Sequence, residues 1–518
     1  MNPNAHRPAG RILTPRTHRL TLAAGPLALA ALLGAPAARA QTVLDVPCGQ
    51  PITASSGSEV VLRLQACSYP SMNAAGFPLR VEGNGAVIDL AGGGFAQALG
   101  NQVTLRDLRV TNGTRGGLWL RSFDATLERV VIHGNRALYA EPAGGLWVNG
   151  GVLRQLTISD STISDNSGWQ GGGLWLQPDI DGATVSIVRS TISGNHAVAR
   201  SGDSASGSGG GLYIFSSYGL LTLQLSHSTV SGNRADLWGG GMGVFGNFRG
   251  AIENSTITGN SAVYSGSAIE DQSGGPNNPY PGYFVRRSII AGNGAGGPLE
   301  CAFGFADFKQ DYGYNVLSAG CVGAGAPEAT TRGVPGSGAL LGALADNGGP
   351  TKTHLPQAGS PALDLIPAGS TGCTSGSTDQ RGVARPQNGA CDAGAVEVAP
   401  VVAVWPFSGF FNPVDNLPMA NTMKAGAAVP VKFSLGGDRG LDIFAAGYPQ
   451  SQQVACGSAA ADVVELTVVA AGSKLSYDAA SASYTYAWKT DKAWRGSCRL
   501  LTLRLADGTD HAALFQFK

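Results

Sequence analysis

The stretch "SIVRSTISGN", residues 186–195, contains a hexamer that returns along the chain in nearly the same form. The copies are "STISDN" from Ser161, "STVSGN" from Ser228, "STITGN" from Ser255 and "SIIAGN" from Ser288. In each copy an aliphatic residue stands five positions before the last aliphatic residue of the hexamer, and Asn stands three positions after it. Unequal lengths of chain separate the copies, so the repeat has a constant frame and variable loops.

A spacing of five fits neither a helix nor a straight strand, so we expect the strand to bend once between two inward residues. A third short strand follows in Gly-rich copies such as "GGLWV" at 144–148 and "GGGLYI" at 209–214. Strand, bend, strand, Gly-Asn turn and strand make one coil of a parallel β-helix. Like residues of successive coils then stack, which predicts one interior file through Ile163, Ile192 and Ile257 and hydrogen bonds between stacked Asn side chains.

These repeats resemble the right-handed β-helix of the pectin-lyase-like class, which includes repeats of bacterial surface proteins. The resemblance covers roughly residues 100–300 and implies a fold far more than an activity. We therefore expect an all-β chain with a right-handed parallel β-helix and its N-terminal cap over 41–339. A small capping module over 340–399 and an immunoglobulin-like β-sandwich over 400–518 should follow it.

The segment 340–399 resembles the choice-of-anchor Q module of bacterial surface proteins through the phrases "THLP", "GSPALD", "DQRG" and "CDAGAVE". We expect it to cover the open strand edge of the last coil, because such an edge invites aggregation. Its charged residues form either a hydrogen-bonded plug, which we favour, or a charged site. These residues are Asp364, Asp379, Arg381, Arg385 and Asp392.

The final segment carries short alternating strands that are typical of a sandwich. It resembles the bacterial PxKF domain through Pro430-Val431-Lys432-Phe433, followed by "GSKLSYD" and "YAWKTD". This resemblance implies an accessory immunoglobulin-like module with no assigned activity.

The first forty residues predict export. They hold five arginines and no acid, then a run rich in Leu and Ala, then a small-residue cleavage site that ends at Ala40. We expect a signal peptide over 1–40, a mature chain from Gln41, and no transmembrane segment in the mature chain. The protein should then be secreted or held at the cell surface.

Eight cysteines fall into four couples that are close in sequence. In an exported protein we interpret them as disulfides, with neighbour pairing as the hypothesis, since sequence alone leaves the connectivity open. The hypothesised pairs are Cys48 with Cys67, Cys301 with Cys321, Cys373 with Cys391, and Cys456 with Cys498.

The charged residues point away from nucleic acid and from clustered catalytic acids. Removing residues 1–40 changes the formal net charge from zero to −5, so no basic nucleic-acid surface is implied. Two positions after the first aliphatic residue of each repeat, charges of both signs mix, which favours a solvated face with cross-strand pairing. This bend file reads Asp107, Arg129, Asp160, Arg189, His227, Asn254 and Arg287.

The histidines give no further sign of catalysis. His133, His196 and His227 occupy different repeat positions, so we expect neither a metal site nor pairing with a nucleophile. We predict no catalytic residues, no metal and no cofactor.

One file of residues indicates a surface function. If the flanking aliphatic residues point inward, four aromatic residues on successive coils point outward: Trp119, Trp147, Trp175 and Tyr213. Such a strip can bind sugar rings or a partner protein. The alternatives are that a loop such as 177–183 or 196–208 covers it, or that the register is inverted and the tryptophans belong to the core.

Taken together, these patterns predict an exported, non-enzymatic β-helix scaffold for binding or adhesion outside the cell. Its partner would be a polysaccharide or a surface protein, and not a nucleic acid. The alternative is a polysaccharide lyase or glycoside hydrolase of the pectin-lyase-like class. A purely structural surface stalk is the third hypothesis.

Overall fold

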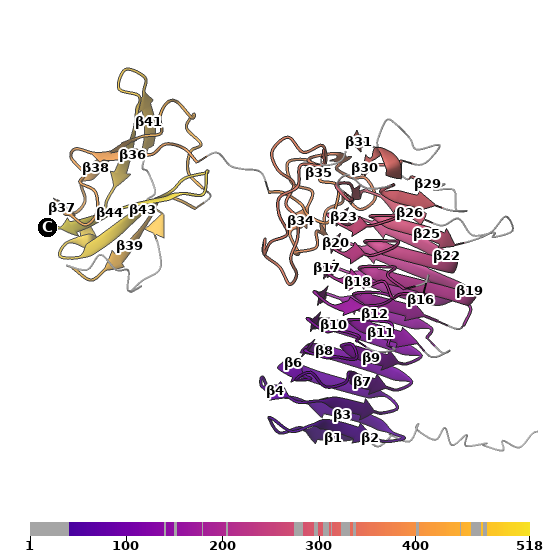
Figure 1. Ribbon diagram of the computed structural model, residues 1–518. Helices are drawn as coiled ribbons and strands as arrows, with labels where there is room; N and C mark the ends of the chain where they lie inside the picture. The colour runs from indigo at the N-terminus through magenta and orange to yellow at the C-terminus, as the bar shows by residue number, and fades with distance from the viewer. Residues whose placement is uncertain are drawn as a thin grey trace, which may run out of the picture.

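The structure, a computed structural model, describes most of the chain after the expected signal peptide, which lies outside the described residues. The described ranges are 41–138, 141–149, 153–178, 180–203, 206–273, 283–294, 299–303, 310–311, 313–322, 332–334, 338–399, 404–445, 447–456, 468–469 and 474–518. Within them the chain is all-β, apart from the short 3-10 helices Ala319–Cys321 and Lys492–Trp494. Figure 1 shows flat coils stacked on one another, with a smaller irregular segment beside the upper coils.

One sheet of 27 parallel strands winds through the coils. The strands that lead into the bend are β1 (Gln41–Asp45), β3 (Glu59–Arg63), β6 (Leu79–Asp89), β8 (Gln102–Thr111), β10 (Asp124–His133), β12 (Gln155–Ser159), β16 (Ala183–Val188), β19 (Leu212–Ser226), β22 (Met242–Glu253), β26 (Tyr283–Arg286) and β29 (Gln310–Asp311), of which β6, β8 and β10 continue through it. The short strands after the bend are β4 (Ser68–Tyr69), β13 (Thr162–Ser164), β17 (Thr191–Ser193), β20 (Thr229–Ser231), β23 (Thr256–Thr258), β27 (Ile289–Ile290), β30 (Val316–Ser318) and β31 (Arg332–Val334).

The third side of the coil is built by the strands that follow the Gly-rich turns. These are β2 (Ile52–Ser55), β5 (Met72–Ala75), β7 (Ala96–Leu99), β9 (Leu118–Arg121), β11 (Leu146–Asn149), β15 (Leu174–Gln177), the first halves of β19 and β22, β25 (Ile269–Ser273) and β28 (Cys301–Phe303). A small parallel sheet follows the Asn turns, with β14 (Ser167–Gly168), β18 (His196–Ala197), β21 (Arg234–Ala235) and β24 (Ser261–Ala262).

The predicted interior file is confirmed. Ile163 pairs in register with Ile192, and the file continues through Val230 to Ile257, all four side chains being buried. The file belongs to one continuous apolar core that extends from Ile52 to Cys321. Burying this file is what fixes the register, since a slip of one residue would expose every inward side chain.

The expected bend is a single residue in the left-handed region of backbone conformation. Every member of the bend file adopts it, for example Asp107 with φ 53°, Arg189 with φ 47° and Arg287 with φ 53°. Non-glycine residues adopt this conformation at some cost, so the bends persist because the packed coils on either side hold them.

Two ladders of side-chain hydrogen bonds explain why the hexamer recurs with so little change. Its Asn is buried, and the side chain of Asn166 donates through Nδ2 to Oδ1 of Asn195 at 3.0 Å, which donates to Asn233 at 2.9 Å. The ladder ends at Glu300, whose Oε1 accepts from Nδ2 of Asn293 at 2.6 Å. Each rung satisfies polar groups that would otherwise be buried without partners.

The first Ser of the hexamer forms the second ladder, which the sequence patterns did not predict. Its hydroxyl oxygen accepts from the backbone N–H one coil below, as in Ser161 N to Ser190 Oγ at 3.1 Å and Ser190 N to Ser228 Oγ at 3.1 Å. The bends interrupt the strand hydrogen bonds, and these serines supply the missing acceptors.

The glycines before the third strand make room for the backbone of the next coil and for the Asn ladder. A Cβ atom on Gly173 would lie 2.8 Å from Nδ2 of Asn195, and one on Gly145 would lie 2.9 Å from Nδ2 of Asn166. No side chain larger than hydrogen fits there, which accounts for the repeated Gly-Gly-Leu phrase.

Four disulfides are present, and each joins the neighbours that the sequence favoured. They are Cys48–Cys67, Cys301–Cys321, Cys373–Cys391 and Cys456–Cys498. No described cysteine is free. The first two close the two ends of the β-helix, and the others lie in the segments that follow.

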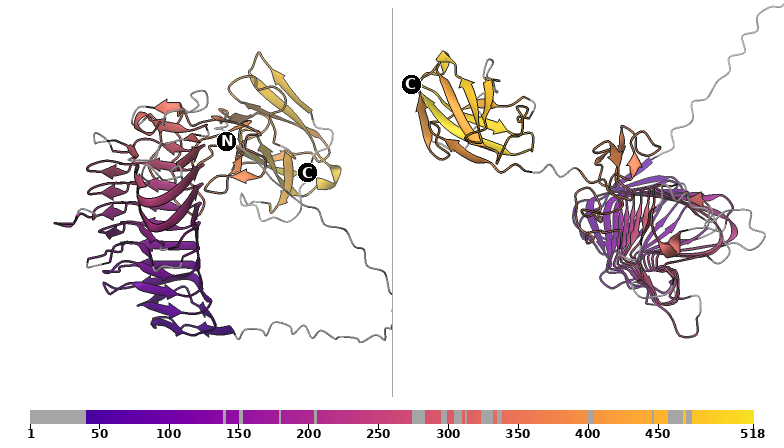
Figure 2. Two further views of the ribbon diagram at one scale, coloured as in Figure 1. Left: turned by 90° about the vertical axis from the view of Figure 1, so that its right-hand side faces the viewer. Right: turned by 90° about the horizontal axis from the view of Figure 1, so that it is seen from above.

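The capping segment, residues 340–399, lies along the side of the upper coils (Figures 1 and 2). It contains two small hairpin-like sheets, β32 (Ile366–Pro367) with β35 (Ala390–Cys391) and β33 (Ser377–Thr378) with β34 (Ala384–Arg385). We expected it over the edge of the last coil. Its contacts are instead with outward side chains of several coils, and Ala362 and Ala393 pack with Ile289 and Val316.

The charged residues of this segment form the hydrogen-bonded plug that we favoured. Oδ2 of Asp379 lies 2.9 Å from Nε of Arg381, and the carboxylate of Asp392 accepts from the backbone N–H of Asp364 at 2.7 Å. The guanidinium of Arg385 is buried and donates to the carbonyl oxygens of Asp392 and Gly394. These groups bind one another, so they do not form an open charged site.

The C-terminal part is a β-sandwich with its own core. One sheet holds β36 (Ser408–Phe411), β38 (Ala428–Ser434), β42 (Ser483–Lys489) and β41 (Lys474–Asp478). The other holds β37 (Ala420–Met423), β44 (Asp510–Phe517), β43 (Cys498–Arg504), β39 (Gln450–Val454) and β40 (Val468–Val469). Trp488, Phe433 and Phe515 are buried between the sheets.

Candidate functional site

The four aromatic residues singled out from the sequence do stack on one outward file, here called the aromatic strip. Trp147 pairs in register with Trp119 below and Trp175 above, and Trp175 pairs with Tyr213. Their aliphatic neighbours along the strands, such as Leu146 and Leu174, point into the core and are buried. The inverted register is therefore wrong.

The rings of the strip pack mainly on one another. Trp119 and Trp147 are stacked with ring centroids 5.4 Å apart, and Trp147 meets Trp175 edge-on at 6.2 Å. Trp119 also donates through Nε1 to Oδ1 of Asn149 at 2.8 Å, while the edge of Phe95 contacts its ring at 5.6 Å. Ring faces used in this way are not open platforms for sugar rings.

The upper half of the strip is covered. Trp175 and Tyr213 are 8% and 5% exposed, and Phe215 and Phe245 pack against them. Burial raises the pKa of Tyr213, and the carboxylate of Asp203, in the loop 196–208, raises it further. Ala143, Phe215 and Phe245 pack over the upper end, whereas Trp119 and Trp147 remain partly exposed. Covering by the loop 196–208 stays a prediction.

The bend file pairs its charges as expected, but only its lower half is a solvated face. Arg129 binds Asp107 through Nε and Oδ1 at 2.6 Å, and Arg189 binds Asp160 in the same way at 2.7 Å. Higher up, Arg287 has a side chain that is only 7% exposed, and its carbonyl oxygen accepts from Gly394 of the capping segment. The capping segment shields this part from solvent.

The hydroxyl face, formed by the outward side chains of β13, β17, β20 and β23, is where the capping segment binds. In the sequence Thr-Ile-Ser the Ile points inward, so the Thr and Ser point outward. Thr191 donates to the carbonyl oxygen of Lys352 at 2.6 Å, and Thr229 donates to Oε1 of Gln380 at 2.7 Å. Nε2 of Gln380 donates back to Oγ1 of Thr191 at 2.9 Å.

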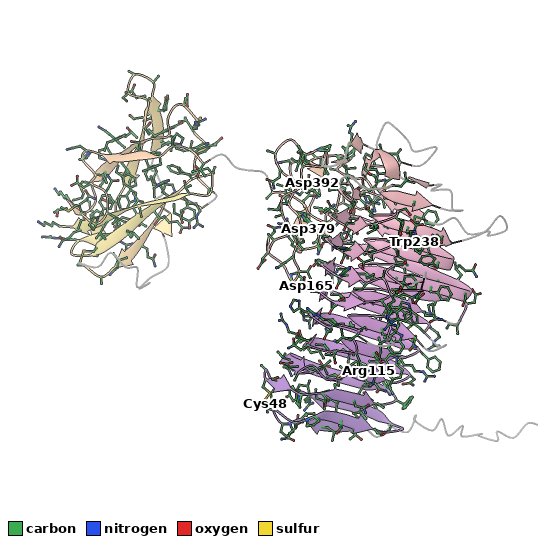
Figure 3. The ribbon with its side chains drawn as sticks, viewed as in Figure 1. Cys48, Arg115, Asp165, Trp238, Asp379 and Asp392 are labelled. Atoms are coloured by element: carbon green, nitrogen blue, oxygen red, sulfur yellow. A yellow bond between two sulfur atoms is a disulfide. The ribbon has the colours of Figure 1, made fainter. Side chains whose placement is uncertain are left out.

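Below these contacts the hydroxyl face opens into a groove of about 550 Å³, here called the polar groove. Its floor comes from five successive coils, and one wall comes from the capping segment. The floor residues are Arg109, Val131, His133, Thr162, Ser164, Asp165, Thr191, Ser193, Gly194, Ser231 and Gly232, and the wall residues are Leu344, Asp346, Gly349, Pro350, Thr351 and Lys352. Figure 3 shows Asp165 below Asp379, at the lower margin of the capping segment.

The centre of the groove holds a His–Asp pair. Nδ1 of His133 lies 3.2 Å from Oδ2 of Asp165 and 3.1 Å from Oγ of Ser164. The side chains of Asp165 and His133 are 60% and 43% exposed, so both face solvent. Ser and Asp contact the same ring nitrogen, whereas a nucleophilic triad needs them on opposite nitrogens. His133 therefore contacts a hydroxyl group, but the three side chains are not arranged for nucleophilic catalysis.

These groove residues were missed because they were weighed one at a time. Their signal is a departure from the repeat on two adjacent coils. His133 stands in a file that reads Asp89 at its lower end and otherwise Thr111, Ser164, Ser193, Ser231 and Thr258. Asp165 adopts φ 55° at a turn where the other copies have Gly. Two exceptions to a stacking rule that meet in space indicate a role beyond stacking.

The carboxyl groups that could act as general acids lie away from the groove. Burial raises the pKa of Asp271 to about 6 and the pKa of Glu397 to about 7. Asp271 belongs to the interior file beside Val244, and Glu397 accepts backbone N–H groups of Gln387 and Asp392 inside the plug. Neither side chain can reach an external polymer, since both are enclosed by protein.

The described ranges contain neither a cluster of metal ligands nor a helix suited to crossing a membrane. No group of three or more His, Cys, Asp or Glu side chains there is placed to hold a metal ion. In the same ranges no helix has the length and apolar character needed to cross a membrane.

Comparison with known families agrees with the fold. A family model described as a right handed beta helix region matches residues 94–298, which is less than half of the chain. The match and the parallel sheet together support a pectin-lyase-like, right-handed parallel β-helix with smaller sheets after it. No curated protein and no solved structure matches the chain.

Proposed function

We propose that the protein is an exported, non-enzymatic β-helix scaffold that binds polysaccharide outside the cell, with the polar groove as its binding site. One observation carries the proposal: a groove of about 550 Å³ with hydroxyl groups on its floor and exposed charged side chains around it. The four disulfides and the arginine-rich, apolar first forty residues support export.

The chemistry of the groove suits a polyhydroxylated ligand. Ser and Thr hydroxyls both donate and accept hydrogen bonds, as sugar hydroxyls do. Arg109 and Lys352 are exposed and form no ion pair among the described residues, so they are available to carboxylate groups of acidic sugars. The lining also includes the apolar side chains of Val131, Leu344 and Pro350, against which the apolar faces of sugar rings could pack.

A peptide ligand fits this floor less well. β13 pairs with β10 and with β17, and β17 pairs with β20, so the strands have no free edge here. An extended peptide that binds by adding a strand needs such an edge. Recognition must therefore use side chains, which favours a polymer with many hydroxyl groups.

The test compares wild type with two groove variants on polygalacturonate, alginate, hyaluronan and xylan, using affinity electrophoresis. Asp165→Gly removes the carboxylate but restores the glycine that other coils use, so the fold should survive. Arg109→Gln has a matched control in Arg121→Gln, an exposed arginine beside the aromatic strip. We expect at least one polymer to retard wild type and Arg121→Gln, and both groove variants to lose tenfold or more in affinity.

Two outcomes contradict the proposal. If none of the four polymers retards the protein, or if both groove variants bind like wild type, the groove is not a polysaccharide site. If reducing ends or unsaturated products appear during incubation, the protein is an enzyme and the alternative of a lyase or hydrolase replaces the scaffold.

The lower end of the aromatic strip is a second candidate site. Trp119 and Trp147 are partly exposed, and the buried Nε1 of Trp147 has no hydrogen-bond partner. A sugar or protein hydroxyl could supply an acceptor only if the ring shifts. Trp119→Ala should weaken binding if the strip contributes, and unchanged retardation on all four polymers would eliminate it.

A further inference from the structure

We infer that the polar groove takes the end of a polysaccharide chain and not its middle. This inference rests on the proposed function. It follows from the position of the capping segment, which closes the groove at one end only.

The upper end is closed by side chains that occupy the hydroxyl face. Gln380 is buried and bonds to Thr191, Thr229 and Thr351. Nε2 of His354 lies 2.6 Å from Oγ of Ser231. One coil higher, Oγ1 of Thr256 accepts from the backbone N–H of Ala395 at 3.1 Å. The polar groups that would bind a continuing polymer are already bound to protein.

The lower end is open. Thr162 is partly exposed and its hydroxyl bonds to no described residue, and Val131 and Arg109 follow below it. The face then continues downward, because Arg109 pairs in register with Val87 on β6. Among the described residues, the capping segment's lowest hydrogen bonds to the coils are at Arg189 and Thr191, above this part of the face.

A polymer can therefore enter along Arg109 and run up the coils until it meets Thr351 and Lys352. The open floor from Arg109 to Thr191 spans three coil intervals, or roughly 14 Å at the usual spacing of parallel strands. A groove that is closed at one end admits a terminus, while an internal stretch of chain would need an exit at both ends. The His133–Asp165 pair lies midway, where it would contact sugars near the terminus.

The experiment measures binding to polygalacturonate and alginate fractions of several chain lengths, each at equal mass. If the groove binds chain ends, the dissociation constant per mole of chains should stay the same from short oligomers to long polymer. The constant per unit mass should then rise in proportion to length. Lys352→Ala should weaken binding of every fraction by the same factor of about five to tenfold, and Lys474→Ala, in the sandwich, should not.

The possible failures are distinguishable. If the dissociation constant per unit mass is the same for all lengths, the protein binds internal stretches. That result overturns chain-end recognition and leaves polysaccharide binding intact. If neither polymer binds at any length, the proposed function fails and this inference fails with it.

Discussion

The hydroxyl face and the aromatic strip are two outward surfaces of the same coils, yet their side chains find partners in different ways. In the strip, Trp119 stacks on Trp147, and Tyr213 packs at a tilt on Phe245 from the next coil, so neighbouring aromatic rings supply most of its contacts. On the hydroxyl face, Thr191 and Thr229 bond to Gln380 from a segment far along the chain. Large apolar groups that stack on one another are stabilised by contacts among themselves. Stacked hydroxyl groups need hydrogen-bond partners from outside the file.

The largest effect is expected from removing a ring of the strip. Trp175→Ala should lower the free energy of unfolding of the β-helix by about 4 kcal/mol, because a buried aromatic side chain is lost and a cavity remains. Guanidinium unfolding measures this. Tyr264→Ala is the control, since its side chain is 58% exposed and should change stability by less than about 0.5 kcal/mol. Equal losses from both variants would contradict the assignment of the strip to packing.

The next largest effect concerns the hydroxyl face. Gln380→Leu should weaken attachment of the capping segment by about 2 to 3 kcal/mol, because Thr229 loses its buried acceptor. Hydrogen exchange over residues 340–399 measures the loss, with Gln357→Leu, at an exposed position, as the matched control. Unchanged exchange in Gln380→Leu would mean that apolar contacts alone hold the segment.

Acid should loosen the same region. Burial, with Arg385, Arg287 and Arg189 nearby, lowers the pKa of His227 to about 4. The folded state therefore favours the neutral imidazole, so this contribution is complete above pH 6.5, the ordinary value, and is lost as pH falls to 4. Thermal unfolding between these values should reveal a loss of about 2 kcal/mol.

A variant separates this histidine from the carboxyl groups that also titrate. His227→Asn places in the bend the residue type that the next coil has at Asn254, where φ is 45°. The acid-dependent loss between pH 6.5 and 4 should shrink in this variant. A pH profile identical to wild type would assign the loss to other groups.

The smallest effect is expected at the groove. Asp165→Gly should raise the free energy of unfolding by about 0.5 kcal/mol, because relief at φ 55° outweighs the exposed pair with His133. Denaturant unfolding of the purified variant measures this. The stability of this variant should be compared with its affinity for polysaccharide. Replacing a residue that serves packing lowers the free energy of unfolding, whereas replacing a residue that serves only ligand binding does not. A marked loss of stability would make Asp165 structural.

The repeat made much of the β-helix predictable. In a file such as Ile163, Ile192 and Ile257, the same need for a buried aliphatic side chain recurs on every coil. One sequence therefore contains enough copies to predict it. The outward register of the tryptophans and the neighbouring cysteine pairs are equally local. The Ser ladder was as periodic as the Asn ladder, and it was missed because its acceptors serve backbone groups at the bends.

The groove could not be predicted in this way. Thr191 and Lys352 are 161 residues apart, and no repeat links the capping segment to a particular coil. Its position depends on single contacts such as Gln380 with Thr229, which have no periodic signal. The side chains that line the groove on the coils carry a weaker signal, as exceptions at His133 and Asp165.

The carboxylate of Glu300 at the end of the Asn ladder limits how this architecture can be lengthened. Every lower rung has an amide that accepts from below and donates upward, but a carboxylate can only accept, so it terminates the series at Asn293. A duplicated coil inserted between two amide rungs would meet matching neighbours on both sides. The same coil added above Glu300 would find no amide donor there to continue the ladder. The β-helix can therefore be lengthened by inserting coils between Asn rungs, but not by adding coils above Glu300.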